Sequence, residues 1–160
     1  MIGVISDTHD NVVNVLKAIN IFENANVDFI IHCGDVISPA TVGFFKGMHI
    51  KVVKGNCDGE INHLKQVLDE IKGEYLGEIG KLDIGGKKIL VYHGSDQNKL
   101  QEFIDEQKYD YVLTAHTHKT RNEKIGKTRV INPGAHYYGC ENKVVLLDLN
   151  KDKVEFVEVV

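Results

Sequence analysis

The sequence contains no tryptophan, only two prolines and only three cysteines in 160 residues, and these scarcities narrow the classes of protein it can be. Cys33, Cys57 and Cys140 lie far apart and form no C-x-x-C pair, which argues against a disulfide framework and a thiolate zinc site. A domain of this length can bury an adequate core without such cross-links. Unpaired cysteines are typical of a reducing compartment, so we expect a cytoplasmic protein.

Long hydrophobic runs and an excess of positive charge are also absent. No apolar run reaches the length of a membrane span, and the opening MIGVISDTHD lacks the basic and apolar regions of a signal peptide. We therefore expect no membrane partner. The net charge of −4 leaves no basic surplus for binding nucleic acid in bulk. A small phosphate-bearing substrate stays compatible with this charge, because bound metal cations can supply positive charge locally.

Two kinds of apolar segment alternate along much of the chain. Short runs rich in branched residues predict buried strands, and segments with apolar residues at helical spacing predict amphipathic helices. This alternation indicates a layered α/β domain. The predicted strands are Ile2–Ile5, Phe29–His32, Lys51–Val53, Lys88–Tyr92 and Tyr111–Thr114, and the predicted helices are Val12–Glu23, Pro39–Phe45, Ile61–Ile71 and Gln97–Glu106.

The remaining segments predict antiparallel hairpins. Tyr75–Asp83 and Lys88–Tyr92 flank the turn sequence IGG, and Val144–Leu149 and Val154–Val159 alternate apolar and polar residues around a polar turn. We therefore predict one α/β (α+β) domain over residues 1–160. It has two mixed β-sheets, one from the α/β half and one including these hairpins, with helices outside.

Each of the five buried strands is followed by a residue that can bind a metal ion. Ligands in open α/β sheets bind beyond the carboxyl ends of the strands, so we expect these side chains to meet at one place. The seven candidate ligands are Asp7, His9, Asp35, Asn56, His93, His116 and His118.

Taken singly, these residues have ordinary explanations. Asp35 and Asn56 are common turn formers after strands, and a lone His93 is more often a hydrogen-bonded core histidine than a ligand. The set is harder to explain in this way, because every member falls at the same end of a predicted strand. Two carboxylates, one amide and four imidazoles suit divalent Mn, Fe, Co, Ni or Zn. Seven ligands exceed the needs of one ion and favour two ions that share a carboxylate.

The order D-x-H, G-D, G-N, H, H-x-H resembles the calcineurin-like metallophosphoesterase superfamily, and the DTHDN and GNCD sequences are most similar to its small single-domain phosphodiesterase branch. The resemblance implies a four-layer αββα sandwich. It also implies two divalent metal ions per chain, with Mn²⁺ or Ni²⁺ expected first and Fe, Co or Zn as alternatives. By motif, one ion is held by Asp7, His9, Asp35 and His118, and the other by Asp35, Asn56, His93 and His116, so that Asp35 bridges.

The reaction that the resemblance implies is attack of a metal-bridging hydroxide on the phosphorus of a small phosphodiester. Asp35, Asn56 and His93 would then be catalytic, through the hydroxide and through positioning of the phosphate. The chain departs from the family pattern where many members have G-N-H-D, because Cys57 replaces that histidine. A thiol is a poor proton donor to a leaving group compared with an imidazole, so we expect a preference for good leaving groups.

Two further residues and two rival functions stay open at this stage. Asn11 either contacts substrate phosphate or caps the following helix, and His136 is a candidate for the rim of the cleft. A phosphomonoesterase could use the same site. A scaffold subunit is the other rival, because the same fold occurs in a retromer coat component with eroded metal ligands. All seven ligand positions are competent here, which favours an enzyme. The sequence does not determine the oligomeric state, and a homo-oligomer stays open.

Overall fold

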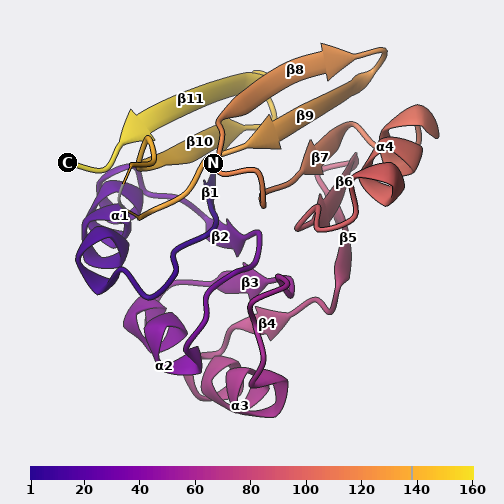
Figure 1. The fold of residues 1–160 in the computed structure, drawn as a ribbon. Coiled ribbons are helices and arrows are strands. Elements are labelled where there is room, and N and C mark those ends of the chain that lie inside the picture. Colours follow the sequence, from indigo (N-terminus) through magenta and orange to yellow (C-terminus); the bar gives the residue numbers. More distant parts are fainter. Residues whose placement is uncertain (138) are drawn as a thin grey trace.

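The computed structural model describes residues 1–137 and 139–160, which form eleven strands and a few helices (Figure 1). The strands are β1 (Ile2–Ile5), β2 (Phe29–His32), β3 (Ile50–Val52), β4 (Glu74–Tyr75), β5 (Ile79–Ile84), β6 (Lys87–Tyr92), β7 (Tyr111–Leu113), β8 (Arg121–Ile125), β9 (Thr128–Asn132), β10 (Lys143–Asp148) and β11 (Lys153–Glu158). The helices are α1 (Val12–Asn24), α2 (Pro39–Val42) with a 3₁₀ turn η1 (Gly43–Phe45), α3 (Ile61–Ile71) and α4 (Gln97–Asp105).

The strands form two mixed sheets. One has six strands in the order β11-β10-β1-β2-β3-β4, and the other has five in the order β5-β6-β7-β9-β8. β1, β2, β3 and β4 run parallel, as do β6, β7 and β9, while the hairpin partners run antiparallel. Short parallel strands buried on both faces explain why the sequence shows them as continuous apolar runs.

Three apolar clusters separate the layers. Phe22 of α1 and Leu68 of α3 pack with Ile30 on the outer face of the six-stranded sheet. The second cluster lies between the sheets and joins, for example, Ile31 of β2 to Leu113 of β7. The third cluster covers the other face of the five-stranded sheet with α4. Helix, sheet, sheet and helix layers therefore follow one another, and the predicted αββα sandwich is confirmed.

Several details of the sequence prediction were wrong. The segment predicted as one strand, Tyr75–Asp83, is divided between β4 in the six-stranded sheet and β5 in the five-stranded sheet. The hairpin β10–β11 does not join the second sheet, because β10 pairs with β1. The predicted helix Pro39–Phe45 is α2 followed by η1, and β8 was not predicted at all.

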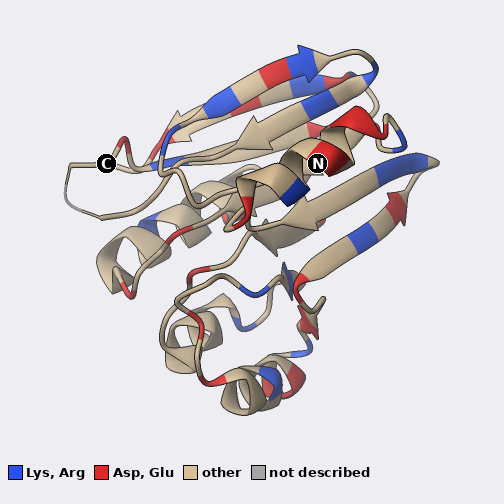
Figure 2. Ribbon diagram, turned by 45° about the vertical axis from the view of Figure 1, so that its right-hand side comes forward, with Lys and Arg blue, Asp and Glu red and all other residues tan. Residues whose placement is uncertain are grey.

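The surface mixes both signs of charge. In the described residues, no helix has the length and hydrophobicity needed to cross a membrane. Figure 2 shows Lys and Arg interspersed with Asp and Glu along the strands and helices, which agrees with the net charge of −4.

Candidate metal centre

The seven predicted ligands all lie in loops that follow the carboxyl ends of parallel strands. These strands belong to both of the stacked sheets. Asp7 follows β1, Asp35 follows β2 and Asn56 follows β3 on the six-stranded sheet. His93 follows β6 and His116 follows β7 on the five-stranded sheet. The backbone connects these loops, because the amides of Asp7 and His9 donate to the carbonyls of Gly34 and Asp35 at 3.0 and 3.2 Å.

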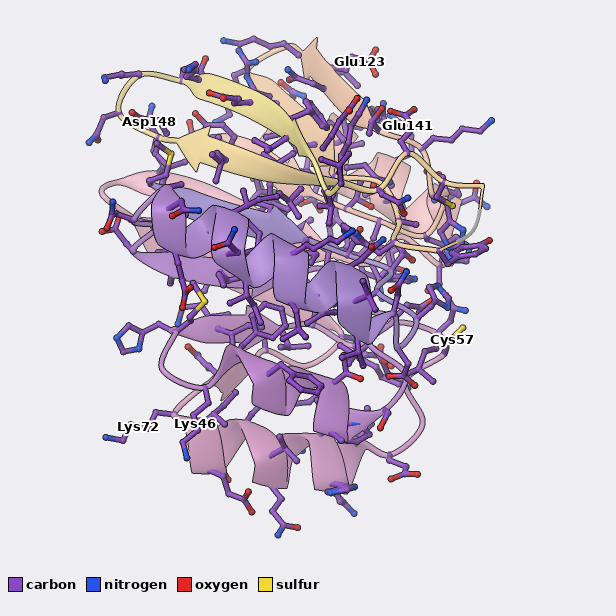
Figure 3. The ribbon with its side chains drawn as sticks, turned by 90° about the vertical axis from the view of Figure 1, so that its left-hand side faces the viewer. Lys46, Cys57, Lys72, Glu123, Glu141 and Asp148 are labelled. Atoms are coloured by element: carbon purple, nitrogen blue, oxygen red, sulfur yellow. The ribbon has the colours of Figure 1, made fainter. Side chains whose placement is uncertain are left out.

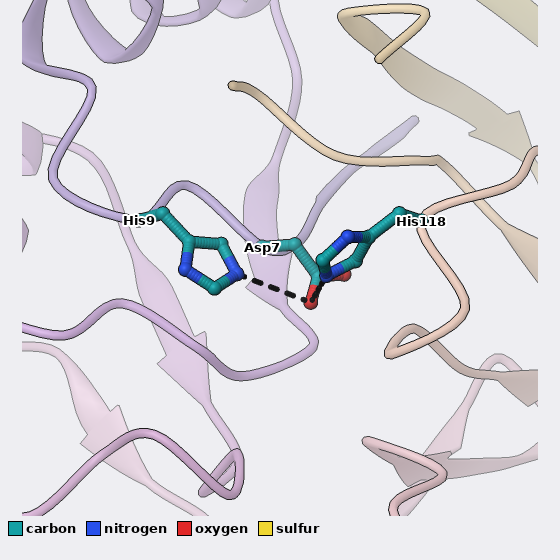
Figure 4. A group of neighbouring side chains, drawn as sticks. All are labelled: Asp7, His9 and His118. Atoms are coloured by element: carbon teal, nitrogen blue, oxygen red, sulfur yellow. Dashed lines mark ion pairs between the residues drawn. The ribbon is translucent and has the colours of Figure 1, made fainter. Parts of the chain in front are cut away.

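One group of ligand atoms lies around Asp7 (Figure 4). A carboxylate oxygen of Asp7 is 3.9 Å from His9 Nε2 and 3.3 Å from His118 Nε2. These three residues each offer one ligand atom within 4.8 Å of the others. His9 Nε2 is also 3.7 Å from Asp35 Oδ2, so the carboxylate predicted to bridge lies next to this group. These residues are the ones that the family resemblance assigns to one ion.

A second group of ligand atoms surrounds the ring of His93. Its Nε2 is 3.0 Å from Asn56 Oδ1, 3.5 Å from Asp35 Oδ2 and 4.0 Å from Asp7 Oδ1. The ring of His116 lies against it, with the two ring centroids 5.3 Å apart. The ligands expected for the second ion therefore gather here, with Asp35 adjacent to both groups.

The tautomer of His93 is set by its other nitrogen. Nδ1 lies 2.8 Å from the carbonyl oxygen of Cys33, which can only accept a hydrogen bond, so Nδ1 carries the proton. In the neutral ring, Nε2 then presents a lone pair toward the oxygens of Asn56 and Asp35. The converging atoms call for positive charge between them, which a proton on Nε2 supplies in the metal-free ring and a metal ion would supply in the loaded site. A ligand histidine whose second nitrogen binds a carbonyl is typical of metal sites.

Unpartnered atoms point to the same requirement in the first group. Asp7 Oδ1 and His9 Nε2 are buried without a hydrogen-bond partner among the described residues. Buried polar atoms are rarely left unsatisfied, since each costs about 1–3 kcal/mol. A divalent cation would satisfy both atoms at once, so the residues fit the metal that the ligand pattern predicts.

Five of the seven candidate ligands have a left-handed backbone conformation. Asp7, His9, Asp35, His116 and His118 all have positive φ, between 43° and 67°. Residues with a Cβ pay roughly 1–2 kcal/mol for this left-handed conformation. Such strain persists where the surroundings enforce it and is frequent at functional sites. Each of these residues turns the chain sharply just after a strand, so the site keeps its ligand geometry at the expense of stability.

The two carboxylates differ in their affinity for protons. Burial raises the pKa of Asp7 to about 6, although the nearby His93 opposes the shift. Burial also opposes ionisation of Asp35, but hydrogen bonds from His93 and from the Cys57 amide, at 2.8 Å, hold its pKa below the usual range. Burial lowers the pKa of His93, yet the Asp35 and Asp7 carboxylates outweigh it and raise the pKa above its ordinary value. Asp35 is therefore the persistent negative charge of the site.

A buried carboxylate outside the ligand set joins two of the ligand loops. Asp58 accepts backbone hydrogen bonds from Asp35 at 3.0 Å, Gly55 at 2.8 Å and Ile37 at 2.9 Å. Gly55 itself lies against Asp35 so closely that a Cβ would be 2.8 Å from the carboxylate carbon of Asp35. The loops after β2 and β3 thus contact each other without room for a larger residue, and this contact sets the position of Asp35.

The family assignment follows from a match over nearly the whole chain. The model of the calcineurin-like phosphoesterase superfamily domain matches residues 1–152. The chain belongs to this superfamily. Phosphodiesterase MJ0936 of Methanocaldococcus jannaschii is 35% identical over 162 residues, covering 99% of this chain and 98% of that protein. The metallophosphoesterase YsnB of Bacillus subtilis, described as probable, is 30% identical over 142 residues, with 82% of this chain and 72% of that protein covered.

Two solved structures share the fold of this chain. An archaeal phosphodiesterase superposes with a TM-score of 0.92 at 34% identity, covering 98% of both chains. Vps29 from Entamoeba histolytica, in complex with Zn²⁺, superposes with a TM-score of 0.70 at 20% identity, covering 99% of both chains. At that identity the second likeness concerns the fold alone.

The structure also shows where Asn11, His136 and Cys57 of this calcineurin-like chain lie. Asn11 caps α1, because its side-chain oxygen accepts from the Asn14 amide at 3.1 Å. His136, weighed from the sequence as a candidate for the rim of the cleft, does not lie there, since its side chain is fully buried. Cys57 is exposed and lies at one edge of the molecule, with Lys46 and Lys72 at the opposite edge (Figure 3). Its amide contacts Asp35, so the thiol stands beside the ligands as the family pattern implied.

Sequence reasoning missed two neighbours of the ligands. Ser95 donates a hydrogen bond from its hydroxyl to Asn56 Oδ1 at 3.3 Å. Tyr137 places its hydroxyl 3.1 Å from His118 Nδ1. The sequence pointed to Tyr137 only through its position shortly after the N-P-G turn, and the neighbouring His136 shares that position.

Proposed function

We propose that this chain is a phosphodiesterase that uses two divalent metal ions, held by Asp7, His9, Asp35 and His118 on one side and by Asp35, Asn56, His93 and His116 on the other. The observation that carries the proposal is the convergence of ligand atoms, with Asp7 Oδ1 and His9 Nε2 buried and unpartnered. A full set of competent ligands distinguishes a catalytic site from the site of a scaffold protein.

The protein groups have distinct tasks in this proposal. Asp35, whose pKa lies below its usual range, stays ionised and supplies the charge shared by both ions. His93 keeps its Nδ1 proton on the Cys33 carbonyl, so that Nε2 and Asn56 Oδ1 face the same point. When bound, a pair of divalent ions lowers the pKa of coordinated water toward about 7 and neutralises charge on the phosphoryl oxygens.

The proposed substrate is a small phosphodiester with a good leaving group. Protonation of the leaving group needs a donor, and Cys57 stands where the family pattern that this chain resembles often has a histidine. Burial and the Asp35 carboxylate raise the pKa of the Cys57 thiol to about 11. A donor so weak gives little help at neutral pH. Mn²⁺ or Ni²⁺ are the proposed ions, since imidazole, carboxylate and amide ligands suit both. The proposed location is the cytoplasm, because Cys33, Cys57 and Cys140 are all free thiols.

A paired measurement tests the proposal. The purified protein is assayed for bound metal, and hydrolysis of aryl phosphate monoesters and diesters is measured with Mn²⁺, Ni²⁺, Co²⁺, Mg²⁺ and Zn²⁺. We expect about two ions per chain and faster hydrolysis of diesters. Asp35→Ala should lose the binding of both ions. The control Asp83→Ala should retain it, because Asp83 lies near the end of β5, where its side chain accepts from the Gly86 amide. Absence of both metal and activity would favour a binding scaffold, and a preference for monoesters would favour a phosphomonoesterase.

A further inference from the structure

The loop after β9 is connected to the loop that carries the first ligand. Ser6 Oγ donates to the Gly134 carbonyl at 2.6 Å, and the His136 amide donates to the Asp7 carbonyl at 3.0 Å. Asn11, which caps α1, also donates through Nδ2 to the His136 carbonyl at 2.7 Å. These three bonds join segments far apart in the chain. They place the next residue, Tyr137, directly beside the first group of ligands.

Tyr137 contacts both histidines of that group. Its ring centroid lies 5.1 Å from the ring of His118, at 85°, and 5.3 Å from the ring of His9, at 57°. The two histidine rings are themselves 5.3 Å apart. The Tyr137 hydroxyl lies 3.1 Å from His118 Nδ1, whereas His118 Nε2 faces Asp7 at 3.3 Å. The tyrosine therefore contacts the ring edge of His118 that faces away from Asp7.

We propose that Tyr137 is a positioning residue for the first metal ion, because it orients the ring of His118 through Nδ1 and packs against His118 and His9 together. The inference rests on the proposed function, since it assigns His118 Nε2 to an ion. Ligand histidines usually need a partner on the second nitrogen, and loss of that partner typically weakens metal affinity about 10–100-fold.

A hydroxyl suits this position because it can donate or accept. When Nε2 holds an ion through its lone pair, Nδ1 carries the ring proton and donates it to the Tyr137 oxygen. When the ion is absent, the ring proton can move to Nε2 and face the Asp7 carboxylate, and the Tyr137 hydroxyl then donates to Nδ1. The same contact holds His118 in both states. A ligand already oriented before the ion arrives loses less conformational entropy on binding.

The test measures affinity at one ion site at a time. An Asn56→Ala background removes a ligand of the second ion, and a His9→Ala background removes a ligand of the first. Mn²⁺ binding is measured by calorimetry and by electron paramagnetic resonance. In the Asn56→Ala background we expect Tyr137→Phe to weaken binding about tenfold. In the His9→Ala background the same substitution should have no effect. Tyr109→Phe is the matched control, because that ring packs in the cluster beneath α4.

A spectroscopic readout separates orientation from general damage. In the Zn²⁺-loaded protein, the Nδ1 proton of His118 should be visible in imidazole ¹⁵N spectra and protected from exchange, and Tyr137→Phe should abolish that protection. Unchanged affinity and unchanged protection in Tyr137→Phe would overturn the inference while leaving the two-ion proposal intact. Equal weakening in both backgrounds would also overturn it, as evidence of general damage. A parent protein that binds no metal would instead refute the proposed function.

Discussion

The contact between Gly55 and Asp35 allows a sharp test of how closely the proposed metal site is defined. Gly55 precedes the ligand Asn56, and its amide donates to Asp58 at 2.8 Å. A Cβ added at Gly55 would lie 2.8 Å from the carboxylate carbon of Asp35 and closer still to its backbone nitrogen, although real Cβ atoms essentially never approach below 3.0 Å. Both neighbours belong to Asp35, so Gly55→Ala must displace the residue proposed to bridge the ions.

The size of the effect follows from the geometry. A contact with backbone cannot be relieved by rotation of a side chain, so one of the two loops has to move by the order of 1 Å. Overpacking of this kind typically costs about 1–3 kcal/mol of stability. A displacement of roughly 1 Å at a catalytic group can lower the rate about 100-fold. We expect Gly55→Ala to fold, to bind its ions at least tenfold more weakly and to lose about 100-fold in diester hydrolysis.

The assay combines Mn²⁺ titration with hydrolysis of bis(p-nitrophenyl) phosphate, and urea unfolding in EDTA gives the stability cost separately. Gly59→Ala is the matched control. It introduces the same methyl group four residues further on, where nothing lies within 4 Å of the added Cβ. The control should retain parental affinity and rate. Parental metal affinity and activity in Gly55→Ala would show that this contact does not position Asp35.

Three further predictions concern the surroundings of the ligands. Asp58→Ala leaves three backbone amides without their acceptor. Urea unfolding should therefore show a loss of about 3–5 kcal/mol of unfolding free energy, and Mn²⁺ should bind more weakly. The control Asp148→Ala frees two amides in the β10–β11 turn and should leave metal binding unchanged. Cys57→His should raise hydrolysis of diesters with poor leaving groups more than that of aryl diesters, and an unchanged ratio of the two rates would contradict the role given to the missing imidazole. Burial lowers the pKa of His32 to about 3 and that of His136 to about 4, so the unfolded chain binds protons that the folded chain does not. Each histidine should therefore remove about 1.4 kcal/mol of unfolding free energy per pH unit as the pH of the metal-free protein falls below 6.5, and His32→Gln should make this dependence shallower; an equal slope in the variant would refute the assignment.

The sequence predicted the strands and their ends well, for a physical reason. Strands β1 and β2 have the predicted bounds because their residues are buried on both faces, which produces an unbroken apolar run. The same burial forces polar residues to appear abruptly at the strand end, so Asp7 and Asp35 could be recognised as a pair. The helix α3 also has its predicted bounds, since its apolar residues recur at helical spacing.

Features that depend on long-range packing could not be predicted. The segment Tyr75–Asp83 reads as one strand, but the chain leaves one sheet after Tyr75 and enters the other at Ile79. Strand β8 is mostly polar and exposed, so it lacks the apolar signal of a strand. Tyr137 contacts His118 only because hydrogen bonds connect its loop to residues near the start of the chain. Such contacts link distant segments and leave no local pattern.

The two ions of the proposed centre would add metal–ligand bonds between two sheets that already meet through apolar packing and a few hydrogen bonds. Asp35 comes from one sheet and His93 from the other, and Ile31 and Leu113 pack between those sheets. Metal supply then becomes a determinant of stability, because a ligand at 100 times its Kd adds about 2.7 kcal/mol to the folded state. The dependence is mutual. Ile31 is buried among apolar side chains between the sheets, so Ile31→Ala would weaken metal binding by loosening their packing. Shortage of metal and a loosened core would therefore both lower the stability of the folded, metal-bound protein.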